Sequence, residues 1–239
     1  MTTIKRKGLK ILAQPDDSTC GPTSLHAVYN FFQFQIGLDE VIADVNFLEE
    51  GGTLAVFLGL DALKKGFQAR IHTSNLSMFD PSWNGLSNSE LIGKLKAQLD
   101  YKKGRKFIVA TNAYIQFLEK GGEITQHMLT EELIGSYLSQ NIPVLTGLSA
   151  TYLYNTKREY ADENDNSIFD DLKGSPMGHF VVITRLENNH FWIADPYQEN
   201  PIAQDKYYRV EAQRVVNAIH LGILTYDANI LIISPKKLI

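Results

Sequence analysis

Cysteine is nearly absent from this chain, with Cys20 the only one among 239 residues. A single cysteine excludes an intrachain disulfide, and so low a count is typical of a reducing compartment. It also excludes a zinc site built from several cysteines, and the six histidines are scattered without the i,i+4 spacing of a helical zinc motif. We therefore expect neither disulfides nor a metal centre.

Long apolar runs and an excess of positive charge are missing as well. The apolar run at 230–233 is far shorter than the roughly 20 residues of a membrane-spanning helix. The basic first ten residues are not followed by an apolar segment ending in a cleavage site, so we expect no secretion signal. A net charge of −4 without a basic stripe argues against nucleic-acid binding. We expect a cytoplasmic protein without membrane insertion.

What the chain does contain is a change of apolar pattern between its first and second halves. Helical spacing is expected after Cys20 and over 38–48, 53–66 and 89–101, with an early strand at 67–73. Later strands are expected over 106–111, 142–148, 179–186, 190–195 and 229–234, with helices at 112–122, 129–141 and 212–221. Helices first and an antiparallel sheet later predict an α+β fold. We expect one domain, 1–239, with a helical lobe at about 12–105 and a sheet lobe at about 106–239.

Cys20 stands where a helix is expected to begin, in the stretch LAQPDDSTCGPTSLHAVYNFF. The N–H groups and positive dipole end of a helix N-terminus favour a thiolate over a thiol. Pro22 suits the first helical turn because its missing N–H is not needed there. A free cysteine is also commonly a small buried apolar residue, so position alone leaves a nucleophile and an inert core residue equally open.

Gln14, six positions before Cys20, favours the chemical interpretation. A nucleophile that attacks a carbonyl needs hydrogen-bond donors directed at the developing oxyanion. A glutamine one short loop before the nucleophile can fold back to supply one donor, and the Cys20 backbone N–H can supply the other. Gln14 is therefore a candidate for the oxyanion hole.

The candidate bases are His179 and His190, at opposite ends of one expected hairpin. His179 opens a strongly apolar strand, whereas His190 follows Asn188-Asn189 at the hairpin tip, where a solvated polar residue is ordinary. Asp195 lies sixteen positions after His179 and returns to the same end of the sheet, so it can orient His179. Side-chain alternation adds a condition: the two residues share a face only if the hairpin has an odd loop or a bulge.

Taken together, QPDDSTCGPTSL, GHFVVI and ADPY resemble the papain-like cysteine peptidases. Within them, the chain is similar to the branch that removes double-glycine leader peptides from bacteriocin precursors and to its stand-alone relatives. The resemblance implies a papain-like fold, in which a helical lobe bearing Cys20 packs against a sheet lobe bearing His179 and Asp195, with a cleft between them. It also implies that Gln14 lies in the oxyanion hole.

The function expected from these residues is thiol-dependent hydrolysis of a peptide or small amide, which needs no metal or organic cofactor. Two alternatives stay open at this point. The same residues would catalyse acyl or peptidyl transfer if an amine replaced water as acceptor. A binding module of the same fold without turnover would also carry this sequence pattern.

Overall fold

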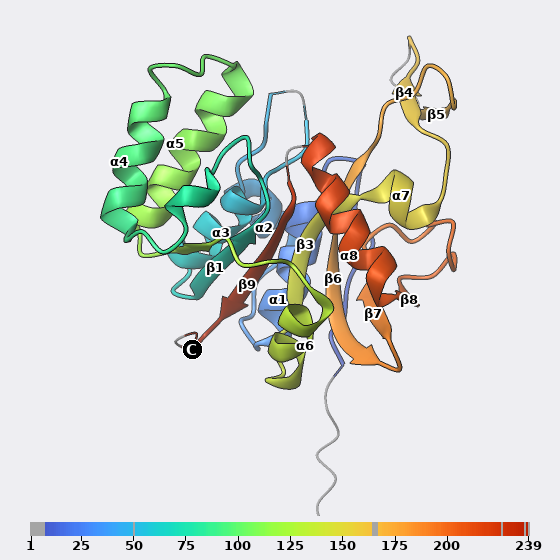
Figure 1. The fold of residues 1–239 in the computed structure, drawn as a ribbon. Coiled ribbons are helices and arrows are strands. Elements are labelled where there is room, and N and C mark those ends of the chain that lie inside the picture. The colour runs from blue at the N-terminus through green and yellow to red at the C-terminus, as the bar shows by residue number, and fades with distance from the viewer. Residues whose placement is uncertain (1–7, 50, 164–166, 226, 237, 239) are drawn as a thin grey trace, which may run out of the picture.

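The computed structural model describes residues 8–49, 51–163, 167–225, 227–236 and 238. Its centre is a seven-stranded sheet in the order β2-β1-β9-β3-β6-β7-β8, in which β1 and β2 are parallel and the other neighbours are antiparallel (Figure 1). These strands are β1 Gln68–Thr73, β2 Glu123–Thr125, β3 Val144–Ser149, β6 Gly178–Glu187, β7 His190–Ala194, β8 Tyr207–Glu211 and β9 Asn229–Ser234. A separate hairpin joins β4 Glu159–Ala161 to β5 Ser167–Phe169. The predicted α+β fold is confirmed, and the predicted antiparallel sheet is antiparallel except for the β1–β2 pair.

Helices cover both faces of the sheet. In Figure 1, α8 crosses the front of the sheet and α1 lies behind it, while α4 and α5 form a layer at the side of β1. The helices are α1 Cys20–Phe31, α2 Leu38–Asp44, α3 Ala55–Lys64, α4 Asn88–Gln98, α5 Arg105–Glu119, α6 Glu131–Ser139, α7 Ala150–Tyr154 and α8 Ala212–Leu221. Short 3₁₀ turns span Pro81–Trp83 and Gly222–Thr225.

Strand β6 shows why the apolar run after His179 is almost continuous. Phe180 and Val182 belong to the core on the side of α1, α3 and α5. Val181 and Ile183 belong to the core on the side of α6 and α8. Because successive side chains of a strand point to opposite faces, a strand covered on both sides needs apolar residues at nearly every position.

The strand predicted at 106–111 is wrong: these residues form the first turns of α5. Phe107, Ala110 and Tyr114 are all buried, with the three- and four-residue spacing of one helix face. A short apolar run cannot be assigned to strand or helix by itself, and here it continues the pattern of the helix predicted from 112. The helix packs against α3 and α4, so the helical layer extends past residue 105.

The start of α3 also differs from the helix predicted over 53–66, because α3 begins at Ala55 and Thr53 lies before it. Thr53 donates its hydroxyl hydrogen to the carbonyl of Asn46, 2.8 Å away. The first N–H of α3, from Ala55, instead donates to the buried carboxyl of Asp227 at 2.8 Å. An acidic group from far along the chain thus satisfies the helix N-terminus, as its positive dipole end favours.

Candidate active site

Cys20 is the first residue of α1, and its side chain interacts with that of His179 near the start of β6. A Cβ on Gly21 would lie 2.4 Å from the Thr53 side chain and 3.3 Å from the Phe180 ring, so a glycine is required there. One turn later, Ser24 donates its hydroxyl hydrogen to the Phe180 carbonyl at 3.2 Å. The first turn of α1 is therefore pinned beside the residue that follows His179.

The hairpin of β6 and β7 contains the irregularity that the catalytic interpretation requires. Its turn has only two residues, Asn188 and Asn189, with φ of 50° and 58°. The register then shifts at a bulge between Ile183 and Arg185. Val182 consequently pairs with Ala194, and the next position places Asp195 opposite Val181. The bulge thus puts Asp195 on the same face of the sheet as His179.

His179 and Asp195 form a buried hydrogen-bonded pair. Nε2 of His179 lies 2.8 Å from Oδ1 of Asp195, and the two residues are 9% and 0% exposed. Burial lowers the pKa of His179, but the charge and hydrogen bond of Asp195 and the interactions with Cys20 outweigh it and raise that pKa to about 10. Because Nε2 is held by Asp195, Nδ1 is the ring nitrogen left for the Cys20 sulfur.

The Asp195 carboxylate accepts three further hydrogen bonds. Oδ1 also accepts from the backbone N–H of Tyr197 at 2.8 Å. Oδ2 accepts from the hydroxyls of Tyr154 at 2.8 Å and Tyr208 at 2.5 Å. Burial raises the pKa of Asp195, but the charge of His179 and these donors hold it below its ordinary value. Neither tyrosine was found from the sequence, because no motif marks the segment around either one.

Gln14 lies at the same end of the sheet. Its backbone N–H donates to the carbonyl of Pro196, the residue after Asp195, at 2.9 Å. Its side-chain Nε2 donates one hydrogen to the carbonyl of Asp16 at 2.9 Å. Because a glutamine amide has two hydrogens, the second remains to donate to another acceptor. Oε1 is buried and has no hydrogen-bond partner within the described ranges. The structure thus brings Gln14 next to the Asp195 segment.

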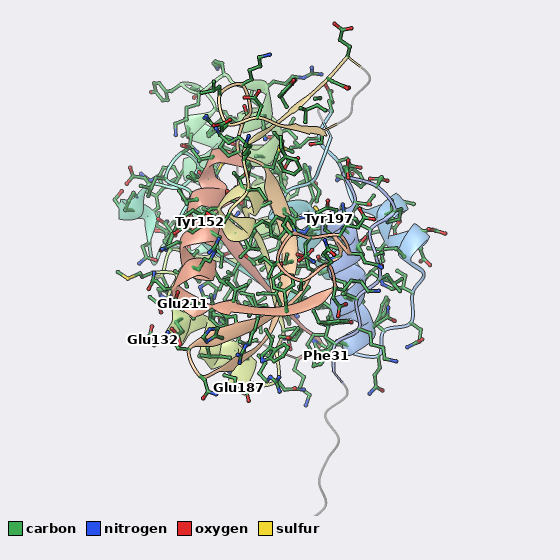
Figure 2. The ribbon with its side chains drawn as sticks, turned by 90° about the vertical axis from the view of Figure 1, so that its right-hand side faces the viewer. Phe31, Glu132, Tyr152, Glu187, Tyr197 and Glu211 are labelled. Atoms are coloured by element: carbon green, nitrogen blue, oxygen red, sulfur yellow. The ribbon has the colours of Figure 1, made fainter. Side chains whose placement is uncertain are left out.

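His190, the other candidate base, lies at the far end of the hairpin. It pairs with Glu187 in the register and its Nδ1 contacts the carbonyl of Asn188 at 2.8 Å. Figure 2 shows Glu187 near the lower end of the molecule and Tyr197 well above it, close to the centre of that face. The length of β6 therefore separates His190 from the start of α1.

The described parts of the chain contain no group of three or more His, Cys, Asp or Glu residues able to hold a metal ion. No described helix has the length and apolar character needed to cross a membrane.

Comparison with known proteins places this arrangement in context. The model of the Peptidase C39-like family matches residues 7–218. A crystal structure described as a C39-like peptidase from Bacillus anthracis superposes with a TM-score of 0.50 at 13% identity, covering 96% of both chains. The peptidase domain of Streptococcus ComA, described as a bifunctional ABC transporter in a quorum-sensing pathway, gives a TM-score of 0.43 at 14% identity, covering 95% of this chain and 99% of that one. No curated protein matches the chain.

Proposed function

Because the chain belongs to the Peptidase C39-like family, we propose that it is a thiol-dependent hydrolase that cleaves amide or peptide bonds. In this proposal Cys20 is the nucleophile, His179 the general acid and base, and Asp195 the group that orients His179, with residues 1–239 acting as one peptidase domain. The observation that carries it is the buried hydrogen-bonded pair of His179 and Asp195. The imidazole ring of His179 also interacts with Cys20. A histidine held by a carboxylate beside a thiol is an arrangement that can activate a thiol nucleophile, which supports the proposal.

The first step is attack of the Cys20 sulfur on the substrate carbonyl carbon. In this step Nδ1 of His179 takes the thiol proton, because the carboxylate of Asp195 stabilises the imidazolium form. The carbonyl oxygen becomes an oxyanion as the carbon–sulfur bond forms. His179 then donates its proton to the leaving nitrogen, so the amine departs neutral and Cys20 holds the acyl group as a thioester.

The second step is hydrolysis of the thioester. Neutral His179 removes a proton from water as the oxygen attacks the acyl carbon. The carbon–sulfur bond breaks, the acid product leaves, and the imidazolium–thiolate pair is restored. Atoms and charges balance without a cofactor. An amine in place of water would give transfer instead, through the same intermediate.

Gln14 completes the proposal as one of two oxyanion donors, together with the Cys20 backbone N–H at the start of α1. Replacing Gln14 by alanine removes one donor and should lower kcat by a factor of about 10² to 10³ with little change in KM. Steady-state kinetics on a cleaved peptide measures this. Gln116→Ala, on the exposed side of α5, is the matched control and should leave kcat unchanged. A Gln14→Ala enzyme with the wild-type kcat would exclude this role.

The raised pKa of His179 predicts the pH above which kcat/KM falls on the alkaline side. The leaving amine needs a proton from the imidazolium form, which is present below the pKa of about 10 and is lost as the pH rises through it. We expect kcat/KM to fall in proportion to proton concentration above about pH 10. A fall centred near pH 6.5, the ordinary value of histidine, would contradict the ion pair with Asp195.

The function itself is tested by incubating the protein with candidate peptides and analysing the products by mass spectrometry, with and without an added amine. Hydrolysis adds one water across the cleaved bond, whereas transfer joins the amine to the acyl fragment. A Cys20→Ala sample is the blank. If the wild-type protein leaves peptides intact and Cys20 reacts with electrophiles no faster than an ordinary thiol, the proposal is wrong.

A further inference from the structure

Tyr154 and Tyr208 converge on one oxygen of Asp195 from two different elements. Tyr154 is the last residue of α7, and Tyr208 lies in β8, directly across from Ile193 of β7. Both hydroxyls donate to Oδ2, at 2.8 Å and 2.5 Å, while Oδ1 receives His179 and the Tyr197 N–H. The two oxygens of the carboxylate therefore have different hydrogen-bond partners: Oδ2 accepts from the two phenols, and Oδ1 binds the imidazole and the Tyr197 N–H.

The structure supports Tyr154 through the short helix that carries it. Ser149 caps α7 by accepting from the Tyr152 N–H at 3.3 Å. Arg214 of α8 donates through Nε to the carbonyl of Leu153 at 3.0 Å and through its terminal nitrogen to that of Tyr152 at 3.2 Å. These contacts hold both ends of a five-residue helix that is too short to be rigid alone.

The same helix is hydrogen-bonded to the segment that leads into β6, the strand that carries His179. The Ala150 N–H donates to the carbonyl of Met177, and the Met177 N–H donates to the Thr151 hydroxyl, both at 2.9 Å. Met177 stands two residues before His179. Helix α7 thus fixes the entry to β6 on one side and, through Tyr154, the carboxylate of Asp195 on the other.

We propose that Tyr154 and Tyr208 are positioning residues that hold Asp195 ionised and in one orientation, so that His179 presents Nδ1 to Cys20. This inference rests on the proposed function and adds two residues to the triad. A buried carboxylate with an unpartnered oxygen would rotate or take up a proton, and either change would weaken its hold on the imidazole. Donors to the charged form prevent both.

The two phenols are suited to hold the Asp195 carboxylate because they stay protonated and so remain hydrogen-bond donors. Burial first, and then the charge of Asp195, raise the pKa of Tyr154 and of Tyr208 well above the ordinary value of tyrosine. Each hydroxyl is therefore a donor throughout the pH range in which a peptidase works. A pair of fixed donors lowers the proton affinity of Asp195 without adding a positive charge that would compete with His179.

The test is the pH profile of Cys20 alkylation by iodoacetamide, followed by intact-protein mass spectrometry, which requires no known substrate. In Tyr154→Phe and in Tyr208→Phe, the pH at which alkylation falls to half on acidification should rise by about one unit. The reason is that the loss of one hydrogen bond to a charged group shifts a pKa by about one unit. The double variant should show a larger shift. Either single variant decides the question if the double variant does not fold.

Tyr29→Phe is the matched control, since the Tyr29 hydroxyl donates to another buried carboxylate, Asp61, at 2.7 Å. It should lower the melting temperature and leave the alkylation profile unchanged. Profiles of Tyr154→Phe and Tyr208→Phe that coincide with the wild-type profile, with only the melting temperature lowered, would overturn the positioning role. His179→Gln separates the two proposals: if it alkylates like the wild type at every pH, the proposed function itself fails.

Discussion

Replacing Cys20 with serine should lower kcat/KM for peptide cleavage by a factor on the order of 10⁴ or more. Knocking out the nucleophile of a hydrolase that uses this kind of triad removes nearly all the rate beyond that supplied by binding and the oxyanion hole. A serine hydroxyl is far less acidic than a thiol, so it cannot form the ion pair with His179 on which the first step depends. Steady-state kinetics on a peptide that the wild-type protein cleaves provides the measurement.

The substitution is nearly isosteric, so the fold should persist. Cys20 is only 8% exposed and packs with the core cluster around α1, where oxygen for sulfur changes little volume. A melting temperature within a few degrees of the wild type confirms that the loss is chemical. Activity within tenfold of the wild type would show that Cys20 is a buried core residue and not the nucleophile.

His179→Gln should cause the second large loss, by a factor on the order of 10³ to 10⁴ in kcat/KM. Glutamine can still hydrogen-bond to Asp195, but it cannot carry a proton from the thiol to the leaving amine. The loss should appear mainly in kcat, because the imidazole moves protons during the reaction and contributes little to binding. Kinetics with saturating peptide separates the two parameters.

His190→Gln is the matched control for that experiment. His190 belongs to the same hairpin and was the other candidate base, yet it lies at the opposite end of β6 and contacts the carbonyl of Asn188. Its replacement should leave kcat/KM within about twofold of the wild type. If the two substitutions cost equally, the assignment of His179 as the base is wrong.

The parts of the molecule that were predictable from sequence are those set by local spacing. The start of α1 at Cys20 follows from the apolar pattern after it. The helix predicted at 129–141 is α6, where the hydroxyl of Thr130 accepts from the Leu133 N–H as an N-cap. Side-chain alternation also predicted that a catalytic His179 and Asp195 need an odd loop or a bulge. The bulge at 183–185 meets that condition.

The features that sequence reasoning missed depend on contacts between distant segments. The apolar run at 106–111 is compatible with either a strand or a helix. In the structure it belongs to α5, which packs against α3 and α4. Asp227 supplies the cap of α3 from 172 positions away, so no local motif marks it. The phenols of Tyr154 and Tyr208 meet at Asp195 only because α7 and β8 fold to the same place.

Contact between the Cys20 sulfur and the His179 imidazole is the central requirement of the proposed mechanism. The most direct test is the rate of Cys20 alkylation by iodoacetamide at pH 6, where an ordinary thiol is almost entirely protonated. We predict that the wild-type protein reacts on the order of tenfold or more faster than a cysteine in an unstructured peptide, and that His179→Gln removes the advantage. Equal, slow alkylation of the wild type and His179→Gln would contradict the central claim.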